Sequence, residues 1–114
     1  MKTLAELRLR PQDKAAIDAA VRILRERFPV EQVILFGSKA RGDDDPEADI
    51  DLLILTRRPL TRPEKNDVLD SLYPLQLEHE VMLTPLIIPF QEWESGLTAF
   101  LPIHREVEEQ GIVI

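Results

Sequence analysis

Two acidic residues, Asp49 and Asp51, stand one residue apart at the head of an apolar run. Because side chains alternate along a strand, both carboxylates would face the same way, roughly 7 Å apart at ~3.3 Å per residue. Magnesium takes oxygen ligands, keeps several waters and completes its shell with substrate phosphates. The spacing therefore predicts a site at which the two carboxylates hold one Mg²⁺ ion, or two ions about 3.5–4 Å apart.

A Gly-Ser pair, Gly37 and Ser38, follows a different apolar run and suits phosphate binding. Glycine permits a tight turn and lets a ligand approach the backbone closely. Serine adds a hydroxyl and a main-chain N–H that can donate to phosphate oxygens. If a short helix starts at Ser38, its exposed N–H groups would also favour an anion. Lys39 and Arg41 place positive charge beside the pair.

Each of these features has an ordinary explanation when it is taken alone. Gly37 and Ser38 could form a simple turn, and Asp49 and Asp51 could be solvated residues at a strand end. Together they form a costly arrangement, because like charges near a partly buried strand end repel each other unless they coordinate a cation. We therefore interpret the two pairs, which the ten residues 39–48 separate, as one phosphate-and-magnesium site.

The elements that must position these residues can be read from the apolar spacing and the nine prolines. A helix is predicted from Pro11 to near Pro29, because apolar residues recur there at helical spacing. Buried strands are predicted at 33–36 and 50–55. The Gly-Ser turn would close the first of these strands, and the two acids would lie near the start of the second.

Prolines also divide the second half of the chain. Pro63 opens a helix that Pro74 ends or kinks. The apolar run 81–88 contains Pro85, which fits an edge strand or a bulge better than the centre of a sheet. The last expected elements are two short helices and a strand, at 90–94, 102–110 (with a stop at Gly111) and 112–114.

This order predicts an α+β fold, a small mixed β-sheet flanked by helices, in a single domain over 1–114. The net charge of −7 argues against tight binding of nucleic acid, which depends on Lys and Arg, but leaves a small polyphosphate open. The chain has no Cys, no run long enough to cross a bilayer and no signal-peptide stretch in 1–10. We therefore expect a cytoplasmic protein with no membrane partner.

Two segments resemble the signature of the DNA polymerase β-like nucleotidyltransferase superfamily: Gly37-Ser38-Lys39-Ala40-Arg41-Gly42 and Ala48-Asp49-Ile50-Asp51-Leu52. That signature is Gly-Ser, a spacer, and then Asp-x-Asp. The length and element order look like the minimal branch of the superfamily, small stand-alone prokaryotic domains often encoded beside a helical HEPN-domain protein. Members of such pairs act as antitoxins that adenylylate the partner, a toxin ribonuclease.

The resemblance implies a polymerase β-like nucleotidyltransferase fold and a role for each matching residue. Gly37 and Ser38 would hold the triphosphate, Arg41 would order the loop or touch phosphate, and Asp49 and Asp51 would bind magnesium. The implied reaction is attack of a hydroxyl on the α-phosphorus of ATP or another NTP, with loss of pyrophosphate and with two Mg²⁺ ions in an active enzyme. The implied acceptor is a protein partner, the HEPN-domain toxin.

One departure from the family pattern concerns a third acidic residue, which active members supply from a later strand. The corresponding residues 78–84 contain no Asp. In one register Glu80 reaches the site, sharing a strand face with Met82 and Thr84, and completes the catalytic carboxylates. In another register Met82 holds the position and the third ligand is missing. The first register predicts an enzyme, and the second a catalytically weak or inactive module that acts by binding a partner protein.

Overall fold

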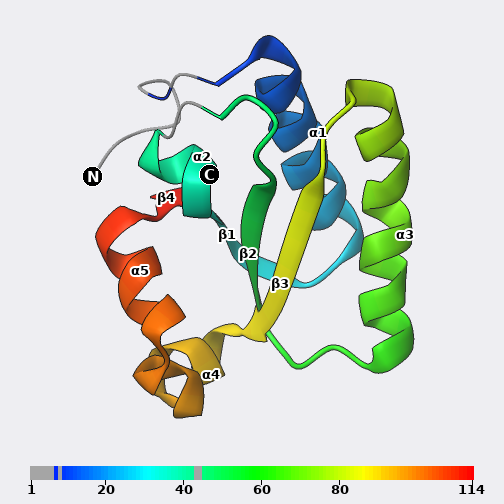
Figure 1. The fold of residues 1–114 in the computed structure, drawn as a ribbon. Coiled ribbons are helices and arrows are strands. Elements are labelled where there is room, and N and C mark those ends of the chain that lie inside the picture. The colour runs from blue at the N-terminus through cyan, green and yellow to red at the C-terminus, as the bar shows by residue number, and fades with distance from the viewer. Residues whose placement is uncertain (1–6, 8, 43–44) are drawn as a thin grey trace.

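The computed structural model describes residues 7, 9–42 and 45–114; residues 1–6, 8 and 43–44, which include most of the N-terminal segment considered above, lie outside the described part. The elements, drawn in Figure 1, are α1 (Pro11–Arg27), β1 (Val30–Phe36), α2 (Gly37–Arg41), β2 (Ile50–Thr56), α3 (Arg62–His79), β3 (Leu83–Pro89), α4 (Phe90–Ser95), η2 (Leu97–Phe100), α5 (Pro102–Gln110) and β4 (Ile112–Val113). The predicted helices and strands are present in the predicted order, and the 3₁₀ turn η2 is an addition.

The four strands form one mixed sheet in the order β3-β2-β1-β4. β1 pairs antiparallel with β2 and with β4, whereas β2 pairs parallel with β3. β2 therefore has a neighbour on each side, and its apolar side chains are buried on both faces of the sheet. A strand covered on both faces is expected to show a continuous apolar run rather than an alternating one. The predicted α+β class with a small mixed sheet is confirmed.

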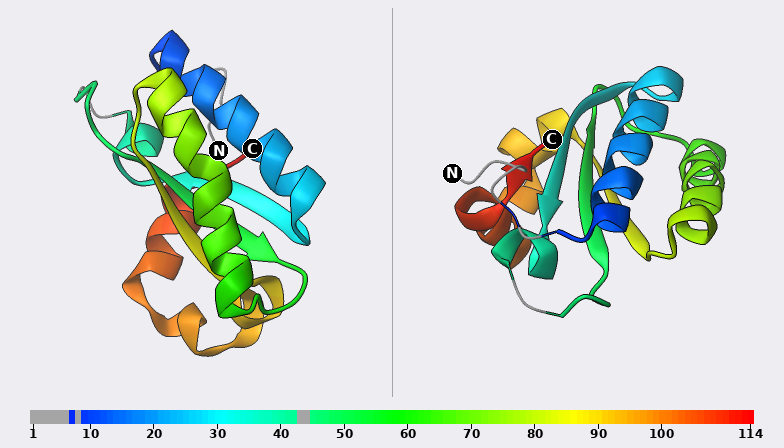
Figure 2. Two further views of the ribbon diagram at one scale, coloured as in Figure 1. Left: turned by 90° about the vertical axis from the view of Figure 1, so that its right-hand side faces the viewer. Right: turned by 90° about the horizontal axis from the view of Figure 1, so that it is seen from above.

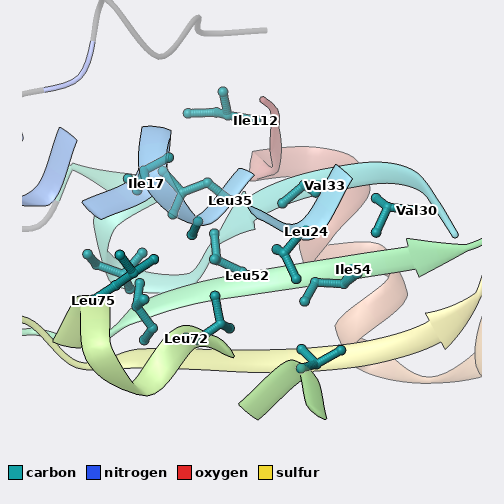
Figure 3. Close-up of a cluster of buried hydrophobic side chains, with 14 of the residues drawn as sticks. Ile17, Leu24, Val30, Val33, Leu35, Leu52, Ile54, Leu72, Leu75 and Ile112 are labelled. Carbon is teal, nitrogen blue, oxygen red and sulfur yellow. The ribbon is translucent and has the colours of Figure 1, made fainter. Parts of the chain in front are cut away.

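Helices cover both faces of the sheet, α1 and α3 one face and α4 and α5 the other (Figure 2). The first core, shown in Figure 3, contains Ile17, Leu24, Val33, Leu35, Leu52, Ile54, Leu72 and Leu75. The second core contains Ile34, Leu53, Leu55, Trp93 and Val107. Fully burying one such side chain stabilises the fold by about 1.5–3 kcal/mol. Because Asp51 has the same parity as Leu53 and Leu55, its side chain belongs to the face that α4 and α5 cover.

β3 is an edge strand, as the sequence predicts from Pro85. The Ile50 N–H donates to the Met82 carbonyl at 2.9 Å, which sets the phase of the parallel ladder between β2 and β3. With this pairing, every second residue of β3 directs its main-chain N–H and C=O groups away from β2, toward the open edge of the sheet. These residues are Leu83, Pro85, Ile87 and Pro89. The Leu83 N–H donates to Oε1 of Gln76 at 2.8 Å, and the two prolines have no N–H. Within β3, only Ile87 is left to present an N–H at the open edge.

Pro74 does not end α3, contrary to one of the two expectations from the sequence, because the helix continues to His79. Proline inside a helix removes one main-chain hydrogen bond and costs about 3 kcal/mol. Pro74 is exposed, whereas Val68, Leu72 and Leu75 are buried on the other side of the helix. Burial of that apolar side therefore continues across the proline and offsets the lost bond.

Trp93 connects α4 to α5 in the second core. The ring centroids of Trp93 and His104 lie 4.3 Å apart, and Nε2 of His104 lies 3.1 Å from the Trp93 carbonyl oxygen. Trp93 is buried in this core. Over the residues that the structure describes, no helix is both long and apolar enough to span a membrane.

Candidate active site

The serine turn lies directly against the acid pair. Phe36 in β1 is the register partner of Asp51 in β2, so Gly37, the next residue, lies beside Asp51. A Cβ atom on Gly37 would overlap Oδ2 of Asp51, so the carboxylate occupies the space that a side chain would need. Gly37 has a φ of 74°, which glycine adopts without the usual steric cost. The structure thus brings the two predicted halves of the site together.

The sequence leads us to expect that this site binds Mg–ATP. On that expectation, replacing Gly37 with Ala should weaken the binding by about tenfold or more, because the added methyl group would displace the Asp51 carboxylate. The positive φ should cost about 1–2 kcal/mol of stability in addition. Gly42→Ala is the matched control, since Gly42 has a φ of 78° but a Cβ there would meet nothing within 4 Å. Calorimetric titration with Mg–ATP and urea denaturation measure the two effects. Equal losses of affinity in both variants would contradict this role for Gly37.

Asp49 is exposed just before β2, next to the start of β3. The Thr84 hydroxyl donates to Oδ2 of Asp49 at 3.5 Å, and Thr84 is also the register partner of Asp51. Met82 lies one step before β3, where its carbonyl accepts the Ile50 N–H. Paired residues share a face of the sheet, so Thr84 of β3 offers the acids a neutral hydroxyl.

Burial and the negative charge of the site both contribute to a raised pKa of Asp51. Burial raises this pKa above its ordinary value, and the negative charges of Asp49 and Glu106 raise it further, while Arg41 acts in the opposite direction. The two aspartates are therefore close enough to repel each other, as the sequence predicts. A divalent cation between them would relieve this repulsion.

Arg41 links the serine turn to the C-terminal helix α5. Its guanidinium donates to Oγ of Ser38 at 3.3 Å and to Oε1 of Glu106 at 2.8 Å. Glu106 was not a candidate from the sequence, because it lies 65 residues from Arg41 and in no recognisable motif. Only the packing of α5 on the sheet brings it to the site.

Lys39 does not direct its charge toward the Gly37-Ser38 turn, contrary to expectation. Its Nζ donates to Oδ2 of Asp13 and to the Pro46 carbonyl, each at 3.1 Å, and the side chain is only 5% exposed. Asp13 is fully buried and also accepts hydrogen bonds from Arg10 at the start of α1. Lys39 therefore fastens α2 to α1, and Arg41 is the cation of the turn that contacts Ser38.

Glu80 does not lie on a strand with Met82 and Thr84, because β3 begins only at Leu83. Glu80 ends α3 in the left-handed conformation, with a φ of 54°, and is exposed. It lines a surface pocket together with residues that include Ala48 and Met82. Glu106, rather than Glu80, is the further carboxylate whose charge acts on Asp51.

The donor set fits a magnesium ion that arrives with a nucleotide. In the described ranges 9–42 and 45–114, no group of three or more His, Cys, Asp or Glu side chains is placed to hold a metal. Mg²⁺ commonly uses one or two carboxylates and fills its shell with waters and substrate phosphates. Asp49 and Asp51, beside a turn suited to phosphate, meet that requirement.

Comparison with known proteins identifies a family profile and relatives that match most of the chain. The sequence profile of the nucleotidyltransferase domain matches residues 17–111. A relative in Methanocaldococcus jannaschii, which carries the provisional name protein adenylyltransferase, is 34% identical over 81% of this chain and 84% of its own length. A second protein of that organism with the same provisional name is 29% identical over 90% of this chain and 97% of its own.

Solved structures share the fold at low sequence identity. A toxin–antitoxin structure, MntA–HpeT, superposes with a TM-score of 0.60 at 19% identity, over 86% of this chain and 70% of that one. A toxin–antitoxin structure with AMP-PNP gives a TM-score of 0.59 at 18% identity, over 91% and 72%. Because the profile matches well over half of the chain and the first relative exceeds 30% identity, the chain belongs to the nucleotidyltransferase domain family.

Proposed function

We propose that this chain is a Mg²⁺-dependent nucleotidyltransferase that moves AMP from ATP to a hydroxyl on a protein partner, with residues 1–114 acting as one domain. The observation that carries the proposal is the contact between Gly37 and the Asp51 carboxylate, which unites a phosphate-binding turn and a metal-binding pair. The provisional names of the relatives support AMP as the transferred group. The AMP-PNP in a structural neighbour supports ATP as the donor.

Some residues of the site would bind the triphosphate, and others would hold the metal ion that neutralises its charge. The main-chain N–H groups of the turn and the Ser38 hydroxyl would bind the triphosphate, and Arg41 would contact it beside Ser38. Asp49 and Asp51 would hold Mg²⁺, which when bound neutralises charge on the phosphate oxygens. The acceptor oxygen forms a bond to the α-phosphorus, the bond from that phosphorus to pyrophosphate breaks, and the hydroxyl proton passes to water.

The acceptor in this proposal is a HEPN-domain toxin encoded beside the chain, as the resemblance implies. The toxin–antitoxin context of two structural neighbours supports a protein partner. The chain has 21 acidic and 14 basic residues, and this excess of negative charge disfavours a long nucleic acid as the acceptor.

The test is transfer of label from α-labelled ATP to the partner in the presence of Mg²⁺. Asp49→Asn should lower the rate at least about 100-fold, because it removes a metal ligand. Asp18→Asn, on the exposed side of α1, removes the same charge elsewhere and should leave the rate unchanged. If no partner receives label, or if Asp49→Asn transfers at the rate of the unchanged protein, the enzymatic proposal fails.

A second candidate function is a binding module that masks the partner without modifying it. Thr84, the residue of β3 that pairs with Asp51, has a neutral side chain rather than a third carboxylate, and this favours the alternative. A masking module should neutralise the toxin equally well with or without the Asp49→Asn change. An enzyme should lose that protection along with the label.

A further inference from the structure

Glu106 lies where the C-terminal helix meets the phosphate-binding turn. Val107, its neighbour in α5, is buried in the second core with Ile34 of β1, which fixes α5 against the sheet. α5 covers the face of the sheet to which Asp51 belongs, and α2 lies close to α5 in Figure 1. Glu106 is therefore held next to the turn by a helix that packs on the sheet, rather than by a loop.

We propose that Glu106 is a positioning residue that holds the Arg41 guanidinium beside the Ser38 hydroxyl, ready for the phosphates of the bound nucleotide. The bonds that support this are 2.8 Å from Arg41 to Glu106 and 3.3 Å from Arg41 to Ser38. In this role Glu106 would contact Arg41 and not the phosphates. The inference rests on the proposed function, because it assigns Arg41 to the nucleotide.

The physical reason is the entropy of a long side chain. An arginine that is free to rotate loses much of its rotamer freedom when it binds a phosphate, and this loss weakens the affinity. A carboxylate that already fixes the planar guanidinium removes part of that cost before the nucleotide arrives. Both side chains are a little over one-third exposed, 37% for Arg41 and 38% for Glu106, so the pair is screened and its effect should be modest.

A carboxylate near a triphosphate also has an opposing effect. The charge of Glu106 acts on Asp51, so it would also repel the phosphates of a nucleotide at the same site. If repulsion were the main effect of Glu106, its removal would strengthen nucleotide binding. If positioning is the main effect, its removal weakens binding, and only when Arg41 is present. The two effects thus have opposite signs.

The experiment is a double-mutant cycle on the dissociation constant of Mg–ATP, measured by calorimetry. Glu106→Ala should weaken binding about fivefold, Arg41→Ala should weaken it at least as much, and the double variant should be no weaker than Arg41→Ala alone. Glu106→Gln should restore most of the affinity, because its amide oxygen still accepts from Arg41. Glu109→Ala is the matched control, since Glu109 lies on α5 but pairs with Arg105.

The outcomes separate this inference from the function on which it rests. Additive losses in the double variant, or tighter binding by Glu106→Ala, would overturn the positioning role while leaving nucleotide binding in place. A loss in Glu109→Ala equal to that in Glu106→Ala would show a general effect of α5 and would also overturn it. If the unchanged protein binds no Mg–ATP, the proposed function fails, and the role of Glu106 fails with it.

Discussion

Asp51→Asn is expected to reduce nucleotidyl transfer at least about 100-fold and, in metal-free buffer, to raise the melting temperature of the protein. The two effects have opposite signs because the same carboxylate is a metal ligand and a source of repulsion. Burial, Asp49 and Glu106 all raise the pKa of Asp51 above its ordinary value. An acid whose pKa is raised by folding destabilises the fold once it ionises, so stability falls as the pH rises from about 4 through the raised pKa.

Thermal denaturation in the presence of a chelator measures the stabilising part of this prediction. The advantage of Asp51→Asn should be present at neutral pH, should shrink as the pH falls through the raised pKa, and should vanish below about 4, where Asp51 becomes protonated in the folded and the unfolded chain alike. Addition of Mg–ATP should raise the melting temperature of the unchanged protein but not that of the variant. A variant that melts below the unchanged protein in chelator, or that still responds to Mg–ATP, would refute the prediction.

Lys39→Met is expected to reduce the free energy of unfolding by about 3 kcal/mol, because it leaves the buried Asp13 carboxylate without one of its two cationic partners. Burial alone would raise the pKa of Asp13, but hydrogen bonds from Arg10 and Lys39 outweigh it and lower the pKa. Asp13 therefore contributes stability at neutral pH that is lost as the pH falls below about 4 through the lowered pKa.

Urea denaturation at several pH values measures this effect, with Arg58→Met as the control. Arg58 forms an exposed ion pair with Glu64, so its loss should cost less than about 1 kcal/mol. The decline in stability on the acidic side should be shallower for Lys39→Met than for the unchanged protein. Equal costs for the two substitutions would show that the Asp13–Lys39 pair contributes no more than a surface pair.

The sequence predicts the central part of the fold because the local signals there agree. The strand before the Gly-Ser turn is a continuous apolar run that ends at Gly37, and the next strand is a continuous apolar run that begins beside the two acids. Similarly, α5 starts at Pro102 and ends before Gly111, as expected. These features depend on backbone geometry and on burial over a few residues. The closeness of the turn to the acids also follows, because two strands joined by a short connection pair as neighbours.

The partners of the charged residues could not be predicted in the same way. Lys39 and Arg41 are two residues apart in α2, yet Lys39 contacts Asp13 and Arg41 contacts Glu106, 26 and 65 residues away along the chain. Which cation enters the core depends on the positions of α1 and α5, which sequence spacing does not specify. Glu80 ends a helix and does not lie in the predicted strand, because α3 continues past Pro74 and β3 starts later than the apolar run suggests.

The open edge of β3 limits the ways in which another protein could bind to this one. Pairing of an added strand with a sheet edge depends on a row of main-chain donors and acceptors. Here Pro85 and Pro89 supply no donor, and the Leu83 N–H is already engaged by Gln76. A guest strand would meet a single N–H, at Ile87, along seven residues. Any protein that binds on this side should therefore be held through side chains, and an extended peptide should not extend the sheet.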